Sequence, residues 1–186
     1  ITSLNIKRDG LRLTDVEAEG VEFKLREMAN GELNVRPIVQ RLTNPNKQSE
    51  FRLYIDEAEI SQSRFRYERL VHRNPVYGVD YGNMEIGQIK GKLSNFAVVR
   101  GVVSSNVDKM YAVERSGFEL KNFTGFFEVD HGEITFENIV ATTDSSKAHI
   151  PKLVLDGENW LEYKNYIDLV EMRGQVINSY LSTHDL

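Results

Sequence analysis

The feature that most constrains the fold of this chain is a short apolar pattern that occurs several times. It is clearest in Phe118–Val129, where Phe118 and Leu120 are separated by one residue, Leu120 and Phe123 by two, and Gly125 follows after one more. A two-residue period is that of a β-strand with one buried face. The single longer step would turn the following residues to the opposite face unless a β-bulge, or a break between strands, absorbs it.

The same pattern, apolar-x-apolar-x-x-apolar-x-small, recurs at irregular intervals. Further copies are Leu11/Leu13/Val16/Ala18, Met84/Ile86/Ile89/Gly91 and Ile134/Phe136/Ile139/Ala141, with a weaker one at Leu53/Ile55/Ala58. The irregular intervals argue against a fixed-period solenoid. The pattern predicts a series of strands, bent or bulged at equivalent points, in which Gly or Ala lets the sheet curve sharply or lets another layer approach.

Only one segment has a helical period. Its apolar residues are Trp160, Tyr163, Ile167 and Val170. With Asn159 as a cap and Gly174 as a stop, they predict a short helix near residues 160–172. The rest predicts a mainly β protein, and we expect residues 1–186 to form a single elongated β domain, with a possible subdivision at the polar connection 43–50. The chain begins at Ile1 and ends on what reads as a new strand, so we expect a fragment of a much longer repetitive protein.

Clear alternation leaves one face of each strand apolar and the other polar. With almost no helix to cover it, the apolar face must be buried by a second sheet layer, by the same sheet folding over, or by something other than protein. The pattern alone favours a closed β-sandwich over an open trough that carries an apolar ligand, and both stay open at this point.

The composition narrows the function classes. The chain is 40% hydrophobic and 27% charged, which is typical of a globular protein. Its net charge is −5, and 23 basic residues are interspersed with 28 acidic ones, so we expect no nucleic-acid partner. The absence of Cys excludes disulfides and Cys-based zinc sites.

No arrangement of residues points to catalysis. The four histidines stand far apart and form no metal-binding motif. The carboxylates occupy the polar alternates of strands, as Glu85, Glu119, Glu128, Glu133 and Glu137 do. We therefore expect that the chain is not an enzyme and that it has neither a metal site nor a cofactor.

Several segments together resemble a known family. They are Val79–Phe96, Ile55–Ser61 with Phe65–Tyr67, Ser116–Leu120, Ile134–Ile139 running to Thr143–Ser146, and Ile177–Leu186. The pattern of residue types in these segments and their order along the chain are similar to those of the large AsmA-like proteins of Gram-negative envelopes. More specifically they resemble the translocation-and-assembly-module B (TamB) proteins of the Bacteroidetes type.

The resemblance implies both a fold and a function. Such proteins are anchored in the inner membrane and cross the periplasm as a long β-sheet folded lengthwise into an open, apolar-lined groove. They are implicated in phospholipid transport between the membranes and in assembling outer-membrane proteins with an Omp85-class barrel. It follows that this chain would be a non-catalytic section of that groove: a curved antiparallel β-sheet of taco-like shape in the periplasm, with phospholipid acyl chains as its ligand. The inner-membrane anchor would lie outside this segment, and the parent protein would make the contact with the barrel.

A conduit for acyl chains needs a continuous apolar lining, because a lipid tail is bound by area at about 25 cal/mol per Å². Our hypothesis for the groove lining is Ile86, Ile89, Leu120, Phe123, Phe136 and Ile139. Whether the residues before or after the longer step face the groove stays open. The alternative function is a structural or adhesive β-sandwich module that binds protein, or a glycan through Trp160 and exposed tyrosines.

Overall fold

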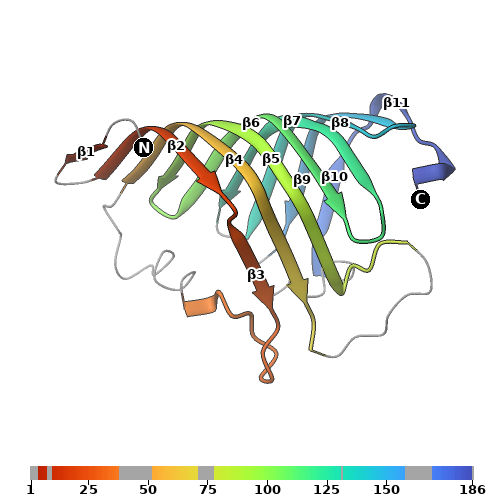
Figure 1. Ribbon diagram of the computed structural model, residues 1–186, viewed down its shortest axis with the longest axis horizontal. Coiled ribbons are helices and arrows are strands. Elements are labelled where there is room, and N and C mark those ends of the chain that lie inside the picture. The colour runs from red at the N-terminus through yellow and green to blue at the C-terminus, as the bar shows by residue number, and fades with distance from the viewer. Residues whose placement is uncertain are drawn as a thin grey trace.

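The strands of this chain form one open, curved sheet that does not close into a barrel (Figure 1). The computed structural model describes residues 4–7, 10–37, 52–70, 78–130, 132–157 and 169–185. In chain order the strands are β1 (Leu4–Lys7), β2 (Gly10–Glu19), β3 (Glu22–Arg26), β4 (Arg52–Glu68), β5 (Asn83–Val99), β6 (Val102–Glu114), β7 (Glu119–Asp130), β8 (Glu133–Thr142), β9 (Lys147–Asp156), β10 (Glu171–Gly174) and β11 (Ile177–Tyr180). A short 3₁₀ helix, Thr183–Asp185, follows β11.

The sheet is mixed rather than purely antiparallel as predicted. Its order is β1-β2-β4-β5-β6-β7-β8-β9-β10. In addition, β3 pairs with β4 on the same side as β2, and β11 pairs with β9 on the same side as β10. The ladders from β4 to β10 are antiparallel, whereas β2 and β3 run parallel to β4. A parallel pair needs a long crossover connection, and the chain between Arg26 and Arg52 is long enough to supply one.

Two further sequence predictions are corrected. A closed two-sheet sandwich is wrong, because every strand in the described part of the chain belongs to the same sheet. Of the helix predicted near 160–172, residues 158–168 lie outside the described ranges. Its end is wrong, because Glu171 and Met172 begin β10 and pair with Asp156 and Leu155 of β9. Pairing with a distant strand has overridden the local helical period at that point.

The possible subdivision at 43–50 lies outside the described residues. The strands on either side of it, β3 and β4, pair along their length, from Glu22 beside Arg64 to Arg26 beside Glu68. The sheet is therefore continuous across that connection.

In three copies of the apolar pattern, those that begin at Met84, Phe118 and Ile134, the longer step is a β-bulge, one of the two outcomes that the sequence predicted. Gln62, Gln88, Asn95 and Asn138 have φ angles of 49°, 53°, 53° and 52°, and each immediately precedes the residue that ends a three-residue step. These values lie in the left-handed region, which only some non-glycine residues adopt readily. The ladder shifts register beside these residues, so the extra residue is absorbed without turning the strand over.

Both halves of the pattern face the same side of the sheet. Ile86 lies beside Phe65 and Ile89 beside Ser63, and the two partners are two residues apart on β4. In the same way Leu120 lies beside Ala112 and Phe123 beside Met110, two residues apart on β6. The question that the sequence left open thus has a simple answer: the residues before and after the step share one face.

Asn138 provides a test of the bulge. Replacing it with Val should lower the free energy of unfolding by about 1–3 kcal/mol, because a β-branched residue is strained in the left-handed region. Asn138→Gly, which adopts that region freely, should remain within about 0.5 kcal/mol of the parent protein. Urea unfolding followed by circular dichroism measures both variants. Equal stability of the Val and Gly variants would show that residue 138 is not held at positive φ.

Candidate functional site

The candidate site is the apolar face of the sheet. One row of paired residues crosses it from β2 to β10: Leu11, Leu53, Val98, Val103, Val129, Ile134, Leu155 and Met172. A second row runs parallel to it from β2 to β9: Ala18, Ile60, Gly91, Met110, Phe123, Ala141 and Ala148. Val129 and Phe123 are six residues apart on β7, so both rows lie on one face. The opposite face carries charged pairs such as Arg12 with Asp56 (2.6 Å).

This face is only partly covered. Among the described residues the buried apolar side chains are Val107, Ala112 and Ile139, exposed by 6%, 8% and 5%. Apart from the exposed Met172, the residues of the two rows are half-buried rather than buried. The described part of the sheet therefore leaves much of this face open to solvent.

All six residues of the groove-lining hypothesis lie on the apolar face: Ile86 and Ile89 of β5, Leu120 and Phe123 of β7, and Phe136 and Ile139 of β8. Ile139 is buried, and the other five are half-buried. The structure brings Ile86 and Leu120 together in one hollow of about 480 Å³, with Met84, Ala112 and Phe118 among the other lining residues. We call this hollow, lined by Ile86 and Leu120, the apolar hollow. The other four residues of the hypothesis, Ile89, Phe123, Phe136 and Ile139, lie on the same face outside it.

Glu114 is a residue of this hollow that the sequence reasoning missed. It lies beside Ile86 on the apolar face and is only 6% exposed. Its carboxylate accepts hydrogen bonds from the backbone N–H of Ser116 (2.6 Å) and of Glu85 (3.3 Å). Burial raises the pKa of Glu114, but hydrogen bonds from Ser116 and from the backbone of Glu85 and Arg115 outweigh it and hold the pKa below its usual value. The group is therefore a buried carboxylate that stays ionised at neutral pH.

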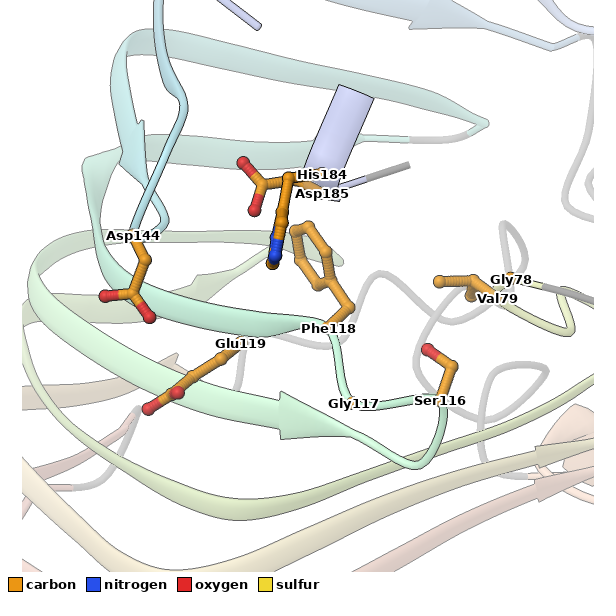
Figure 2. Close-up of a pocket in the computed structure, with 9 residues that line it drawn as sticks. All are labelled: Gly78, Val79, Ser116, Gly117, Phe118, Glu119, Asp144, His184 and Asp185. Atoms are coloured by element: carbon orange, nitrogen blue, oxygen red, sulfur yellow. The ribbon is translucent and has the colours of Figure 1, made fainter. Parts of the chain in front are cut away.

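A second, polar hollow of about 360 Å³ adjoins the first and shares Gly78, Val79, Phe118 and Asp185 with it. Its other lining residues are Ser116, Gly117, Glu119, Asp144 and His184. Figure 2 shows the Phe118 ring directed toward His184 and Asp185, with Asp144 and Glu119 together on one side. We call it the polar mouth.

Asp185 is positioned by the turn between β8 and β9. It accepts hydrogen bonds from the hydroxyl groups of Ser146 and Thr143, the latter at 2.6 Å. The hydrogen bond from Ser146 has the largest effect on the pKa of Asp185, followed by that from Thr143, and together they hold this pKa below its usual value. Ser146 Oγ in turn accepts the N–H of Ser182 (2.9 Å), so the end of the described chain is fastened onto this turn.

Glu119 and Asp144 share one cation. Lys121 Nζ lies 2.8 Å from Glu119 and 3.3 Å from Asp144. Tyr111 also donates a hydrogen bond to Glu119 (2.5 Å), and the hydrogen bonds from Lys121 and then Tyr111 lower the pKa of Glu119. Four carboxylates thus line the two hollows, whereas no Lys or Arg is among their described lining residues.

No group of three or more metal-type side chains comes together within the described ranges. In the same part of the chain, no helical segment has both the length and the apolar character that a membrane span requires. Comparison of the chain with protein-family models, with curated proteins and with solved structures finds no match. The resemblance to the TamB-like proteins therefore stays a prediction from the sequence.

Proposed function

We propose that this chain is a non-catalytic section of a periplasmic β-groove that carries phospholipid, of the AsmA-like and TamB-like kind. In this proposal acyl chains lie along the apolar face of the curved sheet. The parent protein supplies the inner-membrane anchor and meets an Omp85-class barrel at the outer membrane. Its role is phospholipid transport between the two membranes, outer-membrane protein assembly, or both.

The observation that carries the proposal is the row from Leu11 to Met172, which crosses the sheet on a face that the fold leaves partly uncovered. An acyl chain is bound by contact area, at about 0.8 kcal/mol for each buried CH₂ group. Such a ligand needs a long apolar strip and no specific polar partner. A row of Leu, Val, Ile and Met side chains that runs across the strands meets that need.

A second candidate is a structural or adhesive module that binds protein. It is favoured by the large apolar side chains exposed near both lateral edges of the sheet, with Phe23 exposed by 51% on β3 and Met172 by 62% on β10. Edge strands with exposed apolar residues are sites where another strand can add. Glycan binding through Trp160 concerns a residue outside the described ranges.

Lipid uptake by the purified chain decides between these functions. We expect phospholipid to co-purify with the protein, as detected by mass spectrometry of an organic extract, and a fluorescent phospholipid to bind to the delipidated protein. A lipid-free preparation that also fails to take up the fluorescent lipid would contradict the groove. Concentration-dependent association of that same lipid-free protein would then favour the module that binds protein through its edges.

A further inference from the structure

The apolar hollow and the polar mouth together form a cavity with two chemical halves. The apolar half is lined by Met84, Ile86, Ala112 and Leu120, and the polar half by Glu119, Asp144 and His184. Phe118 and Asp185 line both halves. The volumes of the two hollows, about 480 and 360 Å³, fall in the range of small-molecule sites, roughly 300–1,000 Å³. A ligand that fills both halves must be an amphiphile.

The charge of the cavity selects the head group. Glu114 lies in the wall of the apolar half, and among the described residues no Lys or Arg forms an ion pair with it. Its carboxylate is held ionised by backbone hydrogen bonds, and a positive charge that enters the hollow is attracted to it without competition from a cation already bound there. Asp185 lines both halves and is held by hydroxyl groups rather than by a cation. Both carboxylates favour a cation at the junction between the halves.

We propose that this cavity binds a lipid with a protonated amine head group, such as an aminophospholipid. One acyl chain occupies the apolar hollow against Ile86, Leu120 and Phe118, and the ammonium group lies near Asp185 and Glu114 at the junction. Glu119 and Asp144 extend the acidic surface outward. The inference rests on the proposed lipid-carrying function and adds a head-group preference to it.

The test compares two fluorescent lipids with identical acyl chains, phosphatidylethanolamine and phosphatidylglycerol, for uptake by the purified chain. We expect tighter binding of the ethanolamine lipid by about fivefold, which is the effect of one charge pair about 4 Å apart in water-like surroundings. The preference should shrink at 0.5 M salt, since mobile ions screen exposed charges. Equal binding of the two lipids, or tighter binding of the glycerol lipid, would overturn the head-group inference and leave the lipid-carrying function standing. Binding of neither lipid would overturn both.

A double substitution, Glu119→Gln with Asp144→Asn, assigns the preference to this cavity. It leaves the lining of the apolar hollow unchanged, removes two of the three carboxylates of the polar mouth and leaves Lys121 without its two ion-pair partners, so the mouth loses its net negative charge while Asp185 remains. The preference for the ethanolamine lipid should fall below twofold. The matched control is Glu17→Gln with Glu59→Gln, which makes the same change in net charge on the outer face of β2 and β4 and should keep the preference. Equal preferences in the two double variants would place the discrimination elsewhere.

Discussion

Replacing Leu120 with Glu is expected to abolish phospholipid uptake while the protein keeps its fold. Leu120 is half-buried on the apolar face and lines the apolar hollow with Ile86 and Phe118. A carboxylate at this position removes the contact area of a leucine, about 1.5–3 kcal/mol, and places an unpaired charge where an acyl chain would lie. Because the position is partly open to solvent, the new side chain can reach water, and the sheet need not unfold.

The experiment measures fluorescent phospholipid binding, and circular dichroism follows the fold. The matched control is Thr124→Glu, which adds the same charge to β7 on the opposite face, beside Val140. It should bind lipid as the parent protein does. If Leu120→Glu unfolds the protein instead, Leu120 belongs to a closed core, and the structural or adhesive module becomes the better explanation. If Leu120→Glu still binds lipid, the lipid lies elsewhere.

The bulges show how far a local pattern can determine structure. The three-residue step from Ile86 to Ile89 predicts an irregularity, because an uninterrupted strand would place the two side chains on opposite faces. The step does not reveal how the backbone absorbs the extra residue. Gln88 absorbs it by adopting a positive φ, whereas Asn122, the corresponding residue between Leu120 and Phe123, has no positive φ. The period was therefore sufficient to predict a bulge or a break, and insufficient to predict which of the two occurs or which residues share a face.

Long-range pairing was beyond the pattern. The strand β4 spans Arg52–Glu68 without a break, although its alternation of apolar and polar residues is interrupted between Ile60 and Ser63. Ser63 is part of the reason. Its hydroxyl group accepts the N–H of Val21 (3.2 Å) and donates to the carbonyl of Ser61 (2.9 Å), so the interruption in β4 fastens the junction between β2 and β3. No local period predicts that the side chain of Ser63 binds the backbone of Val21, 42 residues earlier in the chain.

The polar half of the cavity was missed for a related reason. Glu114 looks like an ordinary acidic residue at the end of a strand, and Asp185 lies near the C-terminal end of the sequence. They line the same hollow only because the turn at Thr143–Ser146 holds the segment Ser182–Asp185 against the sheet. The apolar members Ile86 and Leu120, by contrast, belong to copies of one pattern, which is why the sequence indicated them.

Replacing Gly91 with Ala should destabilise the protein by about 1–3 kcal/mol, the usual effect of forcing an extra methyl group into a filled space. A Cβ atom at position 91 would collide with the carbonyl oxygen of Lys109 and lie 3.1 Å from Cα of Met110, both of which are backbone atoms of β6. Backbone atoms of a paired strand cannot move aside as a flexible side chain can. The small residue that ends this copy of the pattern is therefore required by the close approach of the neighbouring strand.

Gly87→Ala is the matched control, because a Cβ atom there would meet nothing within 4 Å. Its stability in urea should remain within about 0.5 kcal/mol of the parent protein, as for most substitutions at uncrowded positions. If Gly91→Ala is as stable as Gly87→Ala, strand spacing does not require glycine at position 91.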